Sequence, residues 1–233
     1  MSQGRGRERR GWRAGLAWLT AYQGPLRAAT ARDGPLAAPA SLAFLGLTLA
    51  VSAGWRLPAS HHLVEVCCAY RAADLVAAGR LGRLLGSAFL AQRAVEVLWT
   101  LAASWLVLAP LEVAVGGRRM LAVGFLGHVV PTVLVGLWWL AWRRASQPAV
   151  LDVGTSAVIV TCAAALAVRA RSAPIGLVLV AALTVDVLTA PDLATVEHLL
   201  CVLIGVAAGL VPAGRARPAP IPVSPGRRAG RER

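Results

Sequence analysis

Apolar residues are concentrated in six stretches of the chain, separated by shorter polar or basic connections. The stretches cover about 36–54, 94–115, 120–142, 153–170, 174–190 and 193–212. A bilayer-spanning helix needs ~20 apolar residues, so each stretch is close to that length, the fourth and fifth being the shortest. The pattern predicts an all-α integral membrane protein with six transmembrane helices.

The connection between the first two apolar stretches, about residues 55–93, is too long for a simple turn. Long connections in compact domains are commonly functional or contain short elements of their own. Apolar residues from Leu63 to Val76 recur at helical spacing. They predict an amphipathic segment that lies in the membrane interface.

The composition agrees with a membrane protein. The chain of 233 residues is 57% hydrophobic, whereas soluble domains average roughly 45–50% apolar residues. Its net charge is +13, and all 24 cationic side chains are arginines. These arginines gather at the two ends and between the apolar stretches, with no basic face interleaved with aromatic residues, which argues against nucleic-acid binding. A lysine-free, arginine-rich chain is typical of a GC-rich bacterial genome.

The arginine distribution predicts the orientation. Residues 1–33 carry seven arginines and residues 213–233 carry six, so both tails are expected on the cytoplasmic side. The connections with Arg118–Arg119 and Arg169–Arg171 fall on the same side, whereas Arg143 and Arg144 fall on the outer side against the rule. The sequence thus predicts a basic cytoplasmic tail (1–35), a membrane domain (36–212) with an outer loop (55–93), and a proline-containing cytoplasmic tail (213–233), in a multi-pass protein of the bacterial cell membrane.

Neither the cysteines nor the histidines show the spacing of a metal site. Cys67, Cys68, Cys162 and Cys201 are not spaced as metal ligands, and no disulfide framework is indicated. The adjacent histidines 61 and 62 have two interpretations, metal ligands or interfacial polar residues, and the lack of a third ligand at zinc spacing favours the second. We therefore expect neither a metal nor a cofactor.

Ionisable residues within apolar stretches are costly and are candidates for function. Glu112 and Asp186 stand near the ends of their stretches and are expected at the interface. Glu96, His128 and His198 are expected deeper. His128 precedes Pro131, a helix-kinking residue, and the favoured role for this histidine is a buried hydrogen bond to a neighbouring span.

Ser156 and His198 share one pattern in the fourth and sixth stretches, which the predicted topology makes parallel. Seven and eleven residues beyond each of them stands a small residue, a spacing that returns to within about 20° of the starting direction on a helix. Small residues four apart let membrane helices approach closely. The pairs are Ala163 with Ala167 and Gly205 with Gly209.

If these pairs pack on each other, Ser156 and His198 come level near the outer surface. A serine nucleophile needs a general base within about 2.6–3.2 Å of its hydroxyl, and this arrangement provides one. The alternative interpretation also stands: alanine and glycine are abundant in the chain, and a matched offset can arise by chance. In that case Ser156 is an ordinary helix-packing residue.

Four stretches within residues 80–210 resemble motifs of the rhomboid intramembrane serine proteases, in particular a divergent bacterial branch. The stretches are GRLLGSAFLAQ (82–92), LEVAVGGRRMLAV (111–123), GTSA (154–157) and EHLLCVLIGVAAG (197–209). The first keeps Arg83, Leu84, Leu85 and Phe89 of the family's entry to its second span, and the second keeps Glu112 and Gly116. The resemblance implies a six-helix bundle with a catalytic serine at Ser156 and its histidine at His198.

The chain also departs from the family pattern. Gly82 and Ala91 replace a tryptophan and a histidine, and Ala157 replaces the glycine after the nucleophile. The family's two oxyanion-stabilising residues on span two correspond to Glu96 and Thr100, and an ionised Glu96 would repel an oxyanion. Losing one such donor costs about 2.7–4 kcal/mol in well-studied proteases.

Three alternatives remain for the oxyanion-stabilising donors. Burial of Glu96 would favour its protonated form, and a neutral carboxyl can donate a hydrogen bond. The hydroxyl of Thr100 can donate as well. The backbone N–H of Ser156, together with a side chain such as Gln92, is the third alternative. Gly154 is a further candidate residue of the oxyanion and substrate site.

Two functional hypotheses follow. The first is a Ser–His protease that cleaves the transmembrane segments of other membrane proteins, and the second is a pseudoprotease of the same fold that binds such proteins as clients without cutting them. A small-solute transporter is a weaker third hypothesis, because no inverted repeat is evident. In each case the surroundings are the lipid bilayer, and the oligomeric state is left open.

Overall fold

The computed structural model describes residues 23–71, 74, 80–142, 151–152, 154–189 and 193–212. The predictions about the ends of the two tails, 1–22 and 213–233, lie outside the described residues. So do those about the outer arginines, Arg143 and Arg144, and about the middle of the 55–93 loop.

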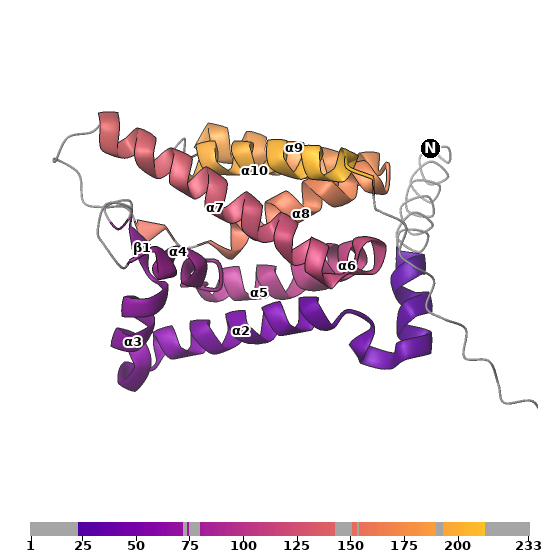
Figure 1. Ribbon diagram of the computed structural model, residues 1–233, viewed down its shortest axis with the longest axis horizontal. Helices are drawn as coiled ribbons and strands as arrows, with labels where there is room; N and C mark the ends of the chain where they lie inside the picture. Colours follow the sequence, from indigo (N-terminus) through magenta and orange to yellow (C-terminus); the bar gives the residue numbers. More distant parts are fainter. Residues whose placement is uncertain are drawn as a thin grey trace, which may run out of the picture.

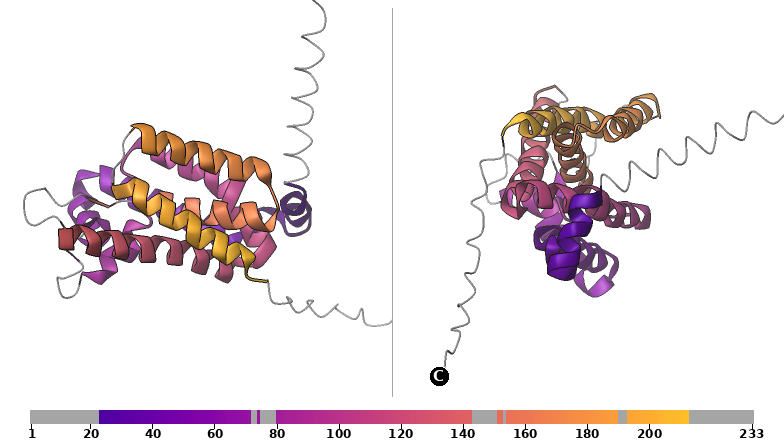
Figure 2. Two further views of the ribbon diagram at one scale, coloured as in Figure 1. Left: turned by 90° about the horizontal axis from the view of Figure 1, so that it is seen from above. Right: turned by 90° about the vertical axis from the view of Figure 1, so that its right-hand side faces the viewer.

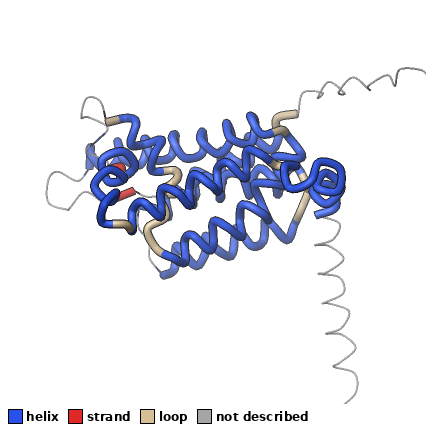
Figure 3. Tube along the Cα trace, turned by 90° about the horizontal axis from the view of Figure 1, so that it is seen from below, coloured by secondary structure: helices blue, strands red, loops and turns tan. Residues whose placement is uncertain are grey.

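The described chain is almost entirely helical (Figure 3). Residues 23–33 are helical. The elements that follow are η1 (Gly34–Ala37), α2 (Pro39–Arg56), α3 (Pro58–Cys68), β1 (Tyr70–Arg71), α4 (Leu81–Ser87), α5 (Ala94–Ala103), η3 (Ser104–Leu108), α6 (Ala109–Val115), α7 (Gly117–Trp142), β2 (Leu151–Asp152), α8 (Thr155–Arg169), α9 (Ala173–Thr189) and α10 (Leu193–Leu210).

Three stretches of helix are long and apolar enough to cross a membrane: Ala94–Val115, Gly117–Ala141 and Leu193–Leu210. Two further apolar helices, Thr155–Arg169 and Ala173–Thr189, are shorter. The prediction of an all-helical protein is confirmed, and the three long helices indicate a membrane protein. Six spans and the side on which the termini lie stay predictions.

The core lies where α7, α8 and α10 cross, with α2 and α5 below them in Figure 1. Cys162 of α8 and Cys201 of α10 are fully buried there. Gly124 and Gly127 allow α7 to approach α8 closely, because a Cβ atom at either position would overlap side chains of α8. The helix α9 differs from these three, since none of its described residues is buried, and it lies at the edge of the bundle in both views of Figure 2.

The helices α8 and α10 are parallel, as the sequence predicted. Their first turns meet at Ser156 and His198, whose side chains are hydrogen-bonded. Their last turns meet where the Arg169 guanidinium donates to the carbonyl oxygens of Gly209 and Val211. The two helices are therefore joined to each other at both ends, and this fixes the position of Ser156 relative to His198.

The glycines Gly205 and Gly209 provide the close approach, but their partners on α8 differ from those predicted. A Cβ atom at Gly205 would overlap the Thr161 carbonyl oxygen, and one at Gly209 would lie 2.8 Å from the Ala165 carbonyl oxygen. The prediction that Ala163 and Ala167 face the two glycines is wrong. At ~100° per residue, the face of α8 that contacts α10 points in a different direction from Ser156. Ser156 therefore reaches His198 from the first turn of α8, outside the packing face.

Glu112, which the sequence placed near the end of its apolar stretch, is buried within the protein, with 5% of its surface exposed. Its carboxylate accepts hydrogen bonds from the backbone N–H groups of Ala40 (2.9 Å) and Ser41 (2.7 Å) and from the Ser41 hydroxyl (2.7 Å). The first N–H groups of a helix have no partner within the helix, and the N-terminus attracts negative charge. Glu112 therefore caps α2 from α6, 71 residues away along the chain.

Replacing Glu112 by alanine is expected to lower the free energy of unfolding by about 1.5–3 kcal/mol, because buried donors lose a charged acceptor. Glu112→Gln is expected to fall between this variant and the wild type, since one carbonyl oxygen still accepts. Unfolding in mild detergent, followed by circular dichroism, measures both. Glu65→Gln is the control, because Glu65 lies on the surface with only a 3.6 Å ion pair to Arg71. Equal stability of Glu112→Ala and the control would contradict the capping role.

The 55–93 loop contains short elements of its own, as predicted. Helix α3 packs through Val64 and Cys68 on the end of α2 and on Leu90. The two-residue strand β1 pairs antiparallel with β2, so that Tyr70 lies opposite Asp152. The loop between the first two predicted spans is thus joined to the segment that enters α8.

The segment predicted as an N-terminal tail (1–35) is partly built into the bundle. Residues 23–33 form a helix, and Leu26 is 2% exposed. Leu26 packs with Ala38 and Ala109 in a small cluster. The packed helical bundle therefore begins before residue 36.

Candidate functional site

The first turn of α8 presents Ser156. Gly154 precedes the helix with φ at −150° and ψ at 78°, and its N–H donates to the Ser87 carbonyl oxygen of α4 at 3.1 Å. The β1–β2 pair lies just before this turn. Ser156 is therefore the second residue of a helix whose start is fixed on two sides.

His128 supports the same turn from α7. The histidine is fully buried, and its Nε2 lies 2.8 Å from the Leu84 carbonyl oxygen and 3.0 Å from the Ser87 hydroxyl. A carbonyl oxygen only accepts, so Nε2 carries the hydrogen. The prediction that His128 is buried is confirmed, but these hydrogen bonds go to the short helix α4 and not, as predicted, to a neighbouring span. Through Ser87 the contact extends to Gly154, two residues before Ser156.

The side chains of Ser156, His198 and Asp186 form a continuous hydrogen-bonded row. The Ser156 Oγ lies 3.1 Å from the His198 Nε2, and the His198 Nδ1 lies 3.1 Å from the Asp186 Oδ2. The three residues come from three helices, α8, α10 and α9. Ser156 and His198 are brought together as the sequence predicted.

The hydrogen-bond partners determine which ring nitrogen of His198 carries the proton. An ionised carboxylate only accepts, so Nδ1 donates to Asp186. In the neutral imidazole, Nε2 then has a free lone pair and accepts from the Ser156 hydroxyl. This is the tautomer in which a histidine acts as a general base towards a serine.

The site is exposed on one side. The side chain of His198 is 17% exposed and that of Asp186 is 44% exposed. Ser156 is half-buried, whereas its neighbours Thr155 and Ala157 are buried. A reacting group therefore reaches the hydroxyl from the side of α9 and α10 and not through α8.

The start of α8 offers backbone donors in the same turn as Ser156. The first N–H groups of α8 have no acceptor within the helix, and Gly154 at the N-cap position makes no side-chain cap. The N-terminus of a helix also carries a partial positive charge, which favours an anion. These groups are suited to stabilise negative charge that develops beside Ser156.

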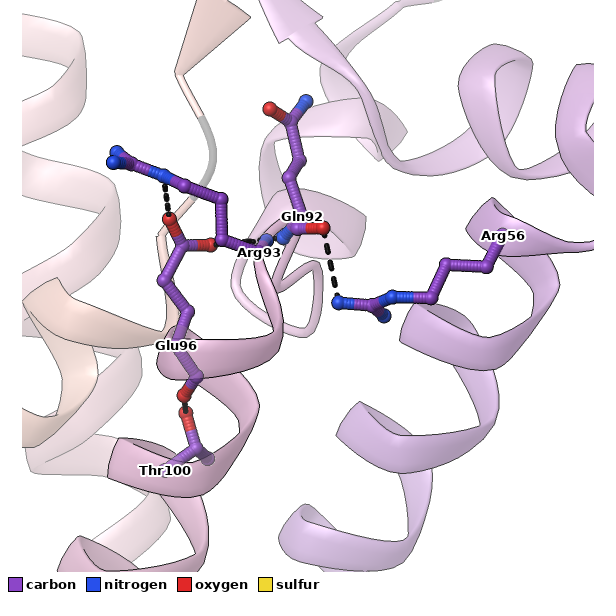
Figure 4. Close-up of polar contacts among 5 residues, drawn as sticks. All are labelled: Arg56, Gln92, Arg93, Glu96 and Thr100. Carbon is purple, nitrogen blue, oxygen red and sulfur yellow. Dashed lines mark hydrogen bonds and ion pairs between the residues drawn. The ribbon is translucent and has the colours of Figure 1, made fainter.

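The sequence suggested that Glu96 lies deep in the bundle. In the structure Glu96 instead caps its own helix. Its Oε2 accepts from the backbone N–H groups of Gln92 (2.8 Å) and Arg93 (3.1 Å), and its Oε1 accepts from the Arg93 guanidinium at 2.7 Å. Figure 4 shows that the side chain of Gln92 points away from Thr100. A neutral Glu96 that donates a hydrogen bond at the serine does not fit these contacts. In each of them a carboxylate oxygen of Glu96 accepts the hydrogen bond.

Thr100 lies closer to the nucleophile than Glu96 does. Its hydroxyl donates to the Glu96 carbonyl oxygen at 2.8 Å and lies 3.0 Å from the Thr155 hydroxyl. Because a hydroxyl has one hydrogen, Thr155 donates to Thr100 in this arrangement. Thr100 therefore positions the residue beside Ser156, and its own hydrogen is turned away from the site.

A thiol alternative to Ser156 exists in the loop but is unsuited to nucleophilic chemistry. The Cys68 Sγ lies 3.1 Å from the Cys67 Sγ at the end of α3. Burial, and after it the hydrogen bond and charge interaction with Cys67, raise the pKa of the Cys68 thiol to about 12. Since the thiolate is the reactive form, Cys68 is inert at neutral pH.

Among the described residues, no three His, Cys, Asp or Glu side chains lie close enough together to hold a metal ion. His61 instead contacts the Trp55 ring, with ring centroids 4.3 Å apart.

Asp186 is the member of the site that the sequence did not reveal. It stands 12 residues before His198, on the preceding helix, and its position near the end of an apolar stretch suggested an interfacial residue. The sequence contained one signal for Asp186. It is an acidic residue in the last turn of an apolar helix, close to the start of the next helix. The folded chain places the carboxylate against the imidazole.

Comparison of the chain with protein-family models, with curated proteins and with solved structures gave no match. The function is therefore inferred from the geometry of Ser156, His198 and their surroundings.

Proposed function

We propose that the protein is a rhomboid-like intramembrane serine protease that cleaves transmembrane segments of other membrane proteins. The observation that carries the proposal is the 3.1 Å contact between the Ser156 Oγ and the His198 Nε2. The two residues stand on parallel helices that glycines hold close together. A nucleophile and its base within hydrogen-bond reach are the signature of covalent catalysis by serine.

The proposed reaction is hydrolysis of a peptide bond in two steps. Ser156 attacks the carbonyl carbon while His198 takes the hydroxyl proton on Nε2, and the imidazolium then gives this proton to the leaving amine. Water, deprotonated by the same nitrogen, cleaves the resulting ester and restores Ser156. No metal or cofactor takes part.

The oxyanion of the tetrahedral intermediate is proposed to bind at the start of α8. The N–H groups of the first turn lie beside Ser156, and the helix dipole adds favourable charge. Preorganised donors of this kind act strongly in a site with little water. This backbone site replaces the side-chain donors that Glu96 and Thr100 do not supply.

The depth of the site follows from the length of α8. The helix has 15 residues, which at 1.5 Å per residue is about 22 Å, while the hydrocarbon layer is ~30 Å thick. If Arg169 lies at the inner interface, Ser156 lies several ångströms below the outer one. A transmembrane substrate would meet the serine within the membrane, with water entering from the exposed side of His198.

The proposed topology has six spans, both termini in the cytoplasm and the site near the outer surface of the cell membrane. Arg119 and Arg169 support it, because both line one apolar cavity of about 540 Å³ at the end of the bundle opposite Ser156. Basic connections are enriched on the cytoplasmic side. The two turns that carry these arginines therefore belong to the same, inner side.

A pseudoprotease that binds membrane-protein clients is the second candidate. It is favoured by the contacts of Glu96 and Thr100. Because of these contacts, neither side chain can donate a hydrogen bond to an oxyanion. Loss of one oxyanion donor costs about 10²–10³-fold in rate. Binding of clients would survive such a loss, whereas cleavage would become slow.

Labelling by a fluorophosphonate probe separates the two candidates. The probe phosphonylates a serine only when a base has activated its hydroxyl, so the wild type in mild detergent is expected to be labelled and Ser156→Ala is not. Ser60→Ala is the matched control, because this hydroxyl only donates to the Gly54 carbonyl oxygen in the loop. A folded wild type that is not labelled would exclude the protease and leave the pseudoprotease.

A further inference from the structure

We infer that Asp186 completes the site as a positioning residue for His198, so that the active arrangement is a triad built from α8, α10 and α9. This inference rests on the proposed function of Ser156 and His198. Asp186 touches neither the substrate nor the serine. It acts through the ring of His198.

The hydrogen-bond geometry gives Asp186 a definite task. A neutral imidazole exchanges its hydrogen between the two ring nitrogens, and only the form with the hydrogen on Nδ1 has a basic Nε2 towards Ser156. The Asp186 Oδ2, 3.1 Å from Nδ1, stabilises this form. It also stabilises the imidazolium that forms when His198 takes the serine proton.

The position of Asp186 has no local structural explanation. The residue stands in the last turn of α9, where the helix dipole disfavours negative charge. Its neighbours Val185, Val187 and Leu188 are exposed apolar side chains, and none of the described residues of α9 is buried. A carboxylate here stabilises neither the helix nor a core, which leaves its contact with His198 as its role.

The exposure of Asp186 sets the size of the expected effect. In buried serine-protease triads, replacing the aspartate with asparagine lowers kcat by about 10⁴-fold. The Asp186 side chain is 44% exposed, and an exposed charged pair contributes less than a buried one. We therefore expect a loss of about 10–100-fold, which is smaller than that from removing Ser156 or His198.

The tautomer of His198 tests the inference without relying on catalysis. The chain has four histidines, and the NMR spectrum of protein labelled with ¹⁵N-histidine, assigned with His198→Ala, reports the protonated nitrogen of His198. The wild type is expected to show hydrogen on Nδ1. In Asp186→Ala the two tautomers should mix. An unchanged Nδ1 signal in Asp186→Ala would overturn the inference.

Rescue by an external carboxylate tests the same role in the reaction. Asp186→Ala is expected to slow the fluorophosphonate labelling of Ser156 by about 10–100-fold, and formate should restore part of the rate because the vacated position is exposed. Chloride at equal ionic strength should not. Thr184→Ala is the matched control, an exposed α9 residue whose hydroxyl donates only within its own helix.

The outcomes separate the inference from the proposed function. Labelling of Ser156 that is equally fast in Asp186→Ala overturns the inference and keeps the protease. A slowed reaction that formate does not restore, in a variant that unfolds like the control, also overturns it. If Asp186→Ala unfolds, Asp186→Asn replaces it, since asparagine keeps the shape and loses the charge. An unlabelled wild type whose His198 still shows the Asp186-dependent tautomer contradicts the proposed function alone.

Discussion

His198→Ala is expected to reduce the rate of substrate cleavage as far as Ser156→Ala does, by on the order of 10⁶-fold in a fully developed serine protease. The two residues act as one unit, because a serine hydroxyl without its base is a weak nucleophile. The double variant should therefore be no slower than either single variant. Cleavage of a fluorescent transmembrane reporter in proteoliposomes measures all three.

His62→Ala is the control for this prediction, since His62 is an exposed residue of α3. It should cleave the reporter at the wild-type rate. Losses from Ser156→Ala and His198→Ala that simply add in the double variant would show that the two residues do not cooperate. In that case their 3.1 Å contact would not be part of the reaction.

Gly205→Ala is expected to lower both stability and activity. The new Cβ atom would overlap the Thr161 carbonyl oxygen and lie 2.7 Å from the Ala164 Cβ, which forces α10 away from α8. Overpacking of this kind costs about 1–3 kcal/mol. A displacement of ~1 Å between reacting groups can cost about 10²-fold in rate, so the labelling of Ser156 should slow by a similar factor.

Gly46→Ala is a sharp control for Gly205→Ala, because the two substitutions add the same methyl group to a helix. Gly46 lies in α2 with nothing within 4 Å of the added atom. Alanine favours a helix over glycine by about 1 kcal/mol, so this variant should be as stable as the wild type or more stable. Thermal unfolding in detergent compares them. A Gly205→Ala variant as stable as Gly46→Ala would contradict the close contact of α8 and α10.

Local sequence patterns predicted the helices well and the contacts between their faces poorly. The six apolar stretches correspond to α2, to α5 through α6, and to α7, α8, α9 and α10. The parallel direction of α8 and α10 also followed from the predicted topology, and the close approach at Gly205 and Gly209 from spacing. The partner residues Ala163 and Ala167 did not, because the side of a helix that faces a neighbour depends on how the two helices cross.

Charged residues show the same limit. Glu112 and Asp186 occupy similar positions near the ends of apolar stretches, and the sequence treated both as interfacial. The structure buries Glu112 as the cap of α2 and places Asp186 against His198. A carboxylate takes its role from donors that lie distant in sequence or across a turn, and spacing within one helix does not reveal them.

The sequence by itself determined the class of structure, a mostly helical membrane protein, and singled out Ser156 and His198 as candidates. Apolar length is a property of local composition, whereas the contact between the two side chains depends on how α8 and α10 pack, because Ser156 does not lie on the face of α8 that meets the glycines. Only the tertiary structure decided the other features of the site. These are the tautomer of His198, the turn held by His128 through α4, the capping role of Glu96, and the contribution of Asp186 from α9. Each of these depends on hydrogen bonds whose geometry exists only in the folded chain, where a donor and an acceptor must meet within about 3 Å.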